Sequence, residues 1–203
     1  GIRSVRGWIV SHADADHISG LMELLQQGYP VEYLILAEHM VCDEALKSLL
    51  VKAERAGCEV LYVPAGMKFG SGDVEFTVLS PREESSADRN AASLSLLLEY
   101  REFRGIFTGD IGEEQERKLL GEGVFEPYGE VDFYKAAHHG SDHSNSLEFL
   151  EAVSPRMTVI SCAKKNSYGH PGREALKRMY AVGSHVFFTM DQGQIRVQPK
   201  EGG

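Results

Sequence analysis

Two histidines and two aspartates lie within six consecutive positions near the start of the chain, in the stretch SHADADHISG, residues 11–20. Imidazole nitrogens and carboxylate oxygens together suit zinc, manganese or iron, whereas calcium prefers oxygen ligands alone. His12, Asp14 and Asp16 alternate and would face one way if the chain stays extended, with His17 turning out as a helix begins. The stretch therefore predicts a site for one or two divalent metal ions.

A structural role is the alternative for the same residues. Asp14 or Asp16 would cap a helix that starts near Ile18, and the two histidines would satisfy nearby backbone groups. The stretch taken alone leaves both interpretations open.

Three further polar clusters lie where predicted strands end. They are Thr108-Gly109-Asp110, His138-His139-Gly140-Ser141 and Tyr168-Gly169-His170-Pro171. Ligand sites in α/β proteins gather at the carboxyl ends of strands, so these clusters and residues 12–17 are expected to converge on one edge. Their joint occurrence strengthens the metal-site interpretation.

The elements that carry these clusters alternate between apolar strands and amphipathic helices. We predict strands at 8–12, 31–38, 58–63, 131–139, 157–163, 185–190 and 194–200. We predict helices at 18–28, 43–57, 113–120, 146–153 and 173–183. Two predicted hairpins, at 67–81 and 93–110, are separated by a polar loop at 82–92. Asp43 is placed to cap its helix and Gly57 to end it. The pattern predicts an α/β fold with mixed, partly parallel sheets.

Composition and charge narrow the class of protein. The chain has 203 residues, 42% of them hydrophobic and 25% charged, which is typical of one globular domain, or at most a domain with an appendage, and argues against disorder. No apolar run approaches the roughly 20 residues of a membrane-spanning helix. The net charge of −9 disfavours a protein whose whole surface clamps a nucleic-acid backbone. Metals that offset the carboxylates would still let an acidic protein cleave a phosphodiester.

The motifs SHADADHISGL, TGD, HHGS and YGHP occur in this order, with α/β elements between them. They resemble the metallo-β-lactamase superfamily and, within it, the soluble domain of ComEC-type DNA-uptake (competence) proteins. HHGS together with YGHP makes the resemblance specific, and it runs over essentially all 203 residues. It implies an αββα sandwich and a metal-dependent hydrolase. The implied enzyme is a phosphodiesterase or nuclease that acts on DNA during uptake and uses one or two manganese or zinc ions.

The resemblance also implies roles for individual residues. The metal ligands would be His12, Asp14, Asp16, His17, Asp110 and His139. Asp16 would also orient the attacking water, and His138 or His170 would protonate the leaving oxygen, because the pKa of histidine lies near 7. The candidate substrate contacts are Asn90, Lys135 and Ser141, with the Lys164-Lys165 pair as another candidate for a phosphate. Which of His138 and His139 is the ligand stays open, with His139 preferred.

The sequence departs from the superfamily pattern in three places. Asp14 stands where a second histidine is usual, which favours manganese or a weakly held metal, and Asn90 stands about where an intermediate histidine is expected. We therefore expect uneven affinity at the two metal positions. Only eleven residues precede His12, where superfamily members usually have two or more strands. We expect that N-terminal strands are missing, that residues 1–203 form a single domain from a longer protein, and that the opened sheet edge permits a homodimer.

The resemblance implies a parent protein that carries a membrane channel and is associated with the bacterial cell membrane, with this chain as a soluble domain of it. Two other classes stay open. One is a hydrolase of small esters, thioesters or lactones, which a narrow apolar pocket around the metals would favour. The other is a metal-poor module that binds DNA or docks onto a channel without cutting, which would retain less than one ion per chain.

Overall fold

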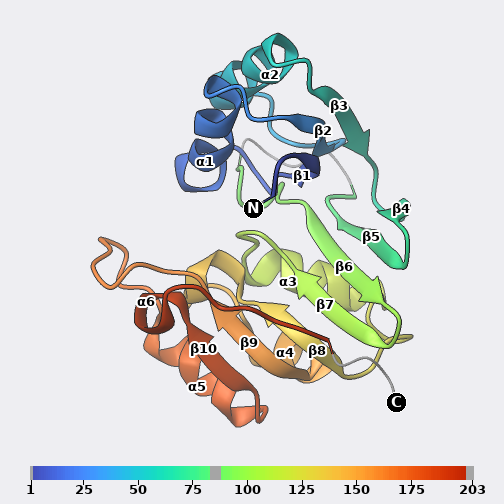
Figure 1. Ribbon diagram of the computed structural model, residues 1–203. Helices are drawn as coiled ribbons and strands as arrows, with labels where there is room; N and C mark the ends of the chain where they lie inside the picture. Colours follow the sequence, from blue (N-terminus) through green and yellow to red (C-terminus); the bar gives the residue numbers. More distant parts are fainter. Residues whose placement is uncertain (1, 83–87, 200–203) are drawn as a thin grey trace. The chain divides into compact units, whose positions relative to one another are not determined.

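The computed structural model describes residues 2–82 and 88–199, so residues 83–87 of the predicted polar loop lie outside the described residues. The chain divides into two compact units (Figure 1). The first unit comprises Gly1–Met67 and Val78–Ser95, and the second comprises Lys68–Thr77 and Leu96–Gly203. The chain passes between the units three times, between Met67 and Lys68, between Thr77 and Val78, and between Ser95 and Leu96.

The first unit contains a parallel three-stranded sheet in the order β1-β2-β3. Its elements are β1 (Val5–Ile9), α1 (Ala15–Gln26), β2 (Val31–Ala37), α2 (Glu44–Arg55) and β3 (Glu59–Val63). The two helices connect successive strands and lie on one face of the sheet (Figure 1). The last four residues of the central strand β2 are all buried, as expected for a strand covered on both faces.

Helix α2 follows directly from local sequence signals. Leu46, Leu49 and Ala53 recur at helical spacing and are buried. The Asp43 carboxylate accepts hydrogen bonds from the backbone N–H groups of Ala45, at 2.9 Å, and Leu46, at 3.1 Å. These bonds satisfy donors that have no partner inside the helix, so the predicted cap is confirmed.

The second unit is built on a seven-stranded sheet in the order β10-β9-β8-β7-β6-β5-β4. Its strands are β4 (Lys68–Ser71), β5 (Val74–Ser80), β6 (Ser95–Tyr100), β7 (Phe103–Phe107), β8 (Val131–Lys135), β9 (Pro155–Ile160) and β10 (His185–Phe188). Strands β7 to β10 are parallel, whereas β4 pairs with β5 and β6 with β7 as antiparallel hairpins. The predicted α/β fold with mixed sheets is confirmed.

Helices α3 (Glu113–Gly121), α4 (Leu147–Val153) and α5 (Arg173–Ala181) connect the parallel strands and lie together on one face of this sheet (Figure 1). Successive parallel strands with right-handed crossovers place their helices on the same side. The ring of Phe149 on α4 is fully buried and packs against Tyr134 of β8 and Phe125, with ring centroids 5.7 and 5.3 Å apart. This layer positions the strand ends that carry the polar clusters.

Three strand predictions differ clearly from the structure. The first strand is Val5–Ile9 rather than 8–12, and β8 ends at Lys135, where a short 3-10 helix (Ala137–Gly140) follows it. A strand cannot continue to residue 139, because His138 and His139 adopt left-handed backbone conformations. Residues 194–199 form no strand, and a short helix α6 (Thr189–Gln192) precedes them, while Lys200 lies outside the described residues.

Candidate metal centre

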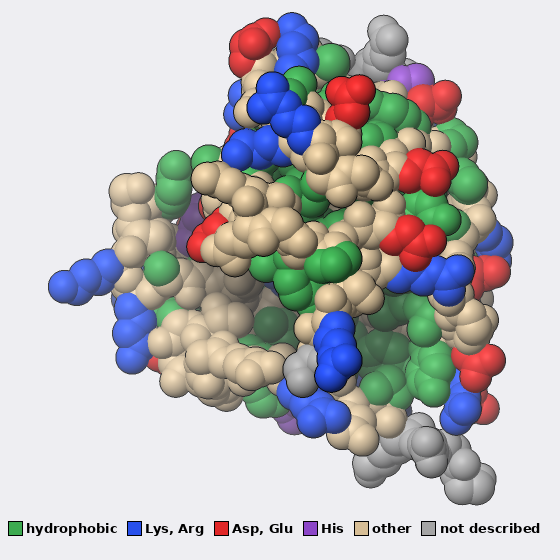
Figure 2. All heavy atoms as spheres, turned by 45° about the horizontal axis from the view of Figure 1, so that its top comes forward, with side chains coloured by type: hydrophobic (Ala, Val, Ile, Leu, Met, Phe, Trp, Pro, Cys, Tyr) green, Lys and Arg blue, Asp and Glu red, His purple; other side chains and the backbone are tan. Residues whose placement is uncertain are grey.

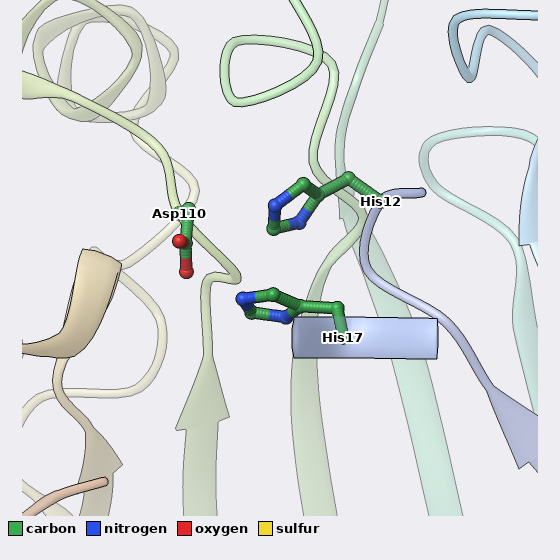
Figure 3. A group of neighbouring side chains, drawn as sticks. All are labelled: His12, His17 and Asp110. Atoms are coloured by element: carbon green, nitrogen blue, oxygen red, sulfur yellow. The ribbon is translucent and has the colours of Figure 1, made fainter. Parts of the chain in front are cut away.

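His12 and His17 of the first unit lie with their rings side by side, with centroids 4.1 Å apart (Figure 3). His12 follows β1, and His17 belongs to the first turn of α1. The Ser11 hydroxyl oxygen lies 3.1 Å from Nδ1 of His12 and 3.2 Å from Nδ1 of His17, and the Ser93 hydroxyl lies 3.4 Å from Nδ1 of His12. Both rings therefore direct Nδ1 toward serine hydroxyls, so Nε2 is the nitrogen that could bind a metal ion.

Each Nε2 atom has a carboxylate of the same motif beside it. Nε2 of His12 lies 3.7 Å from Asp14 Oδ2, and Nε2 of His17 lies 3.6 Å from Asp16 Oδ2. These separations exceed the usual hydrogen-bond length of about 2.7–3.2 Å. Two donors that share a tetrahedral ion at about 2.1 Å lie roughly 3.4 Å apart. The donor types and their spacing therefore fit a divalent transition metal.

The local backbone differs from the extended segment that we expected. Helix α1 begins at Ala15, three residues before the predicted start, so Asp16 and His17 already lie in its first turn. The expected alternation of His12, Asp14 and Asp16 along one extended face is therefore wrong. Asp14 occupies the N-cap position, but its side chain makes no capping hydrogen bond. Helix capping by Asp14 thus does not explain the motif.

Arg89 binds the Asp14 carboxylate, with 2.5 Å between Arg89 Nη1 and Asp14 Oδ1, and its Nε atom donates to Asp43. These two bonds raise the pKa of Arg89. Burial acts to raise the pKa of Asp43, but the Leu46 N–H and the Arg89 guanidinium outweigh it and hold that pKa below its ordinary value. Arg89 therefore links the cap of α2 to the metal motif. We did not single it out from the sequence, although it directly precedes Asn90.

Asn90 lies in the first unit between two residues that contact the motif. Arg89 contacts Asp14, Ser93 lies beside His12, and the Leu94 N–H donates to the carbonyl of Ser11 at 2.8 Å. The Asn90 N–H itself donates to the Asp88 carboxylate at 2.9 Å. The structure therefore brings the segment that carries Asn90 to the histidine motif.

Asp110 and His139 lie together in the second unit. Asp110 is 5% exposed in the turn after β7, where Figure 3 shows its carboxylate. Nε2 of His139 lies 3.4 Å from Asp110 Oδ2, and Nε2 of His138 lies 3.9 Å from the same atom. A hydrogen bond with Asp110 raises the pKa of His139, although burial acts the other way. The surroundings of Nε2 thus favour the protonated, positively charged ring of His139.

The second ring nitrogen of His139 is fixed by the backbone. Nδ1 donates to the carbonyl oxygen of Ser161 at 2.8 Å. Because a carbonyl can only accept, the proton lies on Nδ1 and the neutral ring presents the lone pair of Nε2. A carbonyl behind the ring is the usual support of a metal-binding histidine. This contact favours His139 over His138 as the ligand.

A buried asparagine holds the turn that carries both histidines. His138 and His139 have φ values of 46° and 53°, which non-glycine residues adopt only when their surroundings enforce it. Asn145 is 0% exposed, and its amide donates to the Ala137 carbonyl at 3.1 Å and accepts from the Ala137 N–H at 3.1 Å. The Tyr134 hydroxyl donates to the same amide oxygen at 2.9 Å. The hydrogen bonds between Asn145 and Ala137, which we call the Asn145 clamp, therefore hold the turn in this conformation.

Two helices anchor this clamp. The carboxylate of Glu116 on α3 is fully buried and accepts from the N–H groups of Asn145, at 2.5 Å, and Ser146, at 2.8 Å. Burial raises the pKa of Glu116, and the hydrogen bonds oppose that shift. Arg178 on α5 donates from Nε to the Asn145 carbonyl at 2.8 Å. Asn145, Glu116 and Arg178 were not predicted from the sequence. The available signal was a glutamate three positions before the buried Leu119 of the same helix.

Lys135 and Ser141 lie at the two ends of the same turn. The ammonium of Lys135 donates to the Ala136 carbonyl at 2.9 Å, and burial lowers its pKa against the opposing charge of Asp110. The Ser141 hydroxyl is buried and accepts from the His143 N–H at 3.2 Å. Lys135 therefore lies within the field of Asp110, whereas a substrate contact of Ser141 stays a prediction.

His170 lies against His138, with ring centroids 5.4 Å apart in an edge-to-face arrangement. Burial, followed by the charges of His138 and His139, lowers the pKa of His170. The second unit therefore brings together four predicted site residues, Asp110, His138, His139 and His170.

The second unit also contains a hollow of about 550 Å³ on its sheet. Its walls are almost entirely apolar: Val74, Phe76, Leu98, Tyr100, Phe103, Phe107, Phe133, Val159, Ile195, Val197 and Pro199. None of the predicted site residues lines it. This hollow gives no support to a small-ester pocket built around the histidines.

Parallel β-α units with histidines and aspartates at their strand ends place possible metal ligands where ligand sites gather in α/β proteins. Residues 1–164 match the family model described as the Metallo-beta-lactamase superfamily, and the chain belongs to this superfamily. Its members' fold implies bound divalent metal ions. The predicted family and fold class are confirmed.

The chain is similar to curated proteins, among them one named for competence and one named for recombination. It is 32% identical to ComE operon protein 3 of Bacillus subtilis over 200 residues, which cover 98% of this chain and 25% of that protein. It is 27% identical to Competence protein ComA of Neisseria gonorrhoeae, over 100% of this chain and 26% of that protein. It is also 26% identical to Recombination protein 2 of Haemophilus influenzae, over 93% and 22%. The chain thus spans about a quarter of the length of these relatives.

Solved structures share the fold at low sequence identity. The metallo-beta-lactamase fold protein YhfI of Bacillus subtilis matches with a TM-score of 0.55 and 12% identity, over 90% of this chain and 74% of that one. CmlA of Streptomyces venezuelae matches with a TM-score of 0.58 and 16% identity, over 92% and 44%. CmlA is described as a diiron beta-hydroxylase, so the fold by itself does not determine the reaction.

Proposed function

We propose that this chain is a metal-dependent phosphodiesterase that cleaves DNA, within a protein that serves DNA uptake. The observation that carries the proposal is the arrangement of His139. Its Nδ1 atom is held by the Ser161 carbonyl, and its Nε2 atom lies 3.4 Å from the Asp110 carboxylate. The superfamily membership supports metal-dependent hydrolysis, and the relatives named for competence and recombination support DNA as the substrate.

The proposed ligands are His12, Asp14, Asp16, His17, Asp110 and His139, all of which lie inside the segment that matches the superfamily. When bound, manganese or zinc supplies Lewis acidity and lowers the pKa of water, so that hydrolysis proceeds near neutral pH. Because Oδ1 of Asp14 is bound to Arg89, Asp14 offers one oxygen to a metal. This arrangement supports the expected uneven affinity of the two metal positions.

Four residues would transfer protons, orient water or neutralise charge. The exposed carboxylate of Asp16 would orient the attacking water. The lowered pKa of His170 favours its neutral ring, which would accept a proton rather than donate one. His138 would then protonate the leaving oxygen. Lys135 would neutralise a substrate phosphate.

Two remaining candidates would contact the substrate. Asn90 would do so from the segment that lies against the histidine motif, and Ser141 from the turn that follows His139. On the face drawn in Figure 2, side chains of both charges are interspersed rather than gathered into a basic stripe. Binding of DNA would therefore depend on local contacts more than on the net charge of −9.

We further propose that the parent protein is associated with the bacterial membrane and carries a channel. The relatives that share this segment are about four times as long as the matched part. Among the residues that the structure describes, no helix has both the length and the apolar character needed to cross a bilayer. A homodimer through an exposed sheet edge is part of the same proposal.

The test is cleavage of labelled single-stranded and duplex DNA in the presence of manganese. We expect the native chain to release labelled products, and the double variant His12→Ala, Asp16→Ala to release none, because it lacks one donor from each histidine–carboxylate pair. Glu23→Gln is the matched control, since Glu23 is exposed on the same helix α1. No cleavage by the native chain above the level of the double variant would refute the proposal.

A further inference from the structure

The loop between β9 and α5 can be followed in Figure 1. It carries an exposed aromatic ring beside His170. We call residues 163–170 the aromatic loop. Tyr168 is 80% exposed, and its ring stacks on that of His170 at a centroid distance of 5.8 Å and an angle of 14°. His170 in turn contacts His138 edge to face. One face of the Tyr168 ring is thus backed by His170, while the side chain stays largely open to solvent.

The aromatic loop is held in shape by Asn166. Its amide nitrogen donates to the carbonyls of Ala163, at 3.0 Å, and His170, at 2.7 Å, and its amide oxygen accepts from the His170 N–H at 2.9 Å. Both ends of the loop are therefore tied to one side chain. An aromatic ring on such a loop loses little further conformational freedom when it stacks on a planar ligand.

Two lysines precede the ring in the same loop. Lys164 and Lys165 are both exposed, and the ammonium of Lys164 lies 3.8 Å from the carboxylate of Asp191. An exposed pair of this length is weak and exchanges readily for another anion. The aromatic loop thus combines an open ring face with two ammonium groups.

We propose that Tyr168 is a stacking platform for an unpaired nucleobase of the substrate strand, with Lys164 and Lys165 contacting neighbouring phosphates. Aromatic rings flanked by lysines are the general means by which proteins hold single strands without reading their sequence. A base inside a duplex has both faces covered, so the platform selects single-stranded nucleic acid. This inference rests on the proposed function for its choice of nucleic acid as the substrate.

The inference is tested by fluorescence anisotropy with a labelled oligothymidylate and an abasic strand of the same length, in the presence of EDTA so that nothing is cleaved. Tyr168→Ala should weaken binding of the oligothymidylate roughly 5- to 100-fold. It should leave binding of the abasic strand unchanged, because that strand has no base to stack. Tyr168→Phe should bind the oligothymidylate like the native chain, since the ring face is kept.

Tyr180→Ala is the matched control, because Tyr180 is 56% exposed on α5 of the same unit. Thermal unfolding of each variant checks that it is folded. Native-like binding by Tyr168→Ala, an equal loss on both strands, or no binding of either strand by the native chain would overturn the inference. Failure of the proposed function would give a different result, because Tyr168-dependent binding would persist while manganese-dependent cleavage would be absent.

Discussion

His138 and His139 are neighbours in sequence, yet their hydrogen bonds differ. Only for His139 does the structure record a backbone carbonyl on Nδ1 within the described residues, and its Nε2 lies 0.5 Å closer to Asp110 Oδ2, at 3.4 Å against 3.9 Å. The sequence motif left the choice between them open. The choice depends on Ser161, which lies 22 positions away in the chain and which no local pattern could reveal.

Substitution of the two histidines should separate their roles. His139→Ala should weaken manganese binding more than about 100-fold, because loss of a supporting group behind a ligand already costs roughly 10- to 100-fold. His138→Ala should weaken manganese binding less than about tenfold, because His138 lies beside the metal ligands and is not itself a ligand. Isothermal titration of the metal-stripped protein measures both. Equal losses in the two variants, or a larger loss in His138→Ala, would contradict the assignment.

The cap of helix α2 gives a prediction at the scale of one element. The lowered pKa of Asp43 means that its charged form stabilises the fold. This contribution is present above the unfolded pKa of about 3.9 and is lost as the pH falls through the folded value. Asp43→Ala should therefore lower the free energy of unfolding by about 1 kcal/mol at pH 7.

The same variant should differ less from the native protein as the pH falls below about 4, and the difference should vanish once the pH lies below the lowered pKa of Asp43, where the native carboxyl is protonated as well. Urea denaturation at neutral and acidic pH measures the difference. A difference that stays constant over this range would show that the Asp43 charge does not stabilise the cap.

Elements with local signals could be predicted from sequence, and elements set by distant contacts could not. Helix α2 carries its cap at Asp43, its apolar spacing and its end at Gly57 within fifteen positions, and the prediction is confirmed. The end of β8 depends on the Asn145 clamp, which forces His138 and His139 into left-handed conformations. Residues 194–199 alternate like a strand because Ile195 and Val197 line the apolar hollow, but they form no ladder.

At the scale of the whole molecule, each compact unit carries one histidine–aspartate cluster. The first contains His12, Asp14, Asp16 and His17, and the second contains Asp110, His138, His139 and His170. The motifs of the superfamily are short and contiguous, so sequence analysis found all of these residues. The residues that hold them in place, Arg89, Asn145 and Glu116, act over long separations in sequence, such as the 75 positions between Arg89 and Asp14. They became visible only in the structure.

The central claim is that these clusters bind metal, and the metal content of the purified chain tests it most directly. The protein is stripped with a chelator, dialysed against manganese or zinc, and its ions are counted per chain by mass spectrometry. We predict one or two ions per chain, together with a higher unfolding temperature than that of the stripped protein, because a ligand that binds the native state stabilises it. Less than one ion per chain would contradict the account and identify a metal-poor binding module instead.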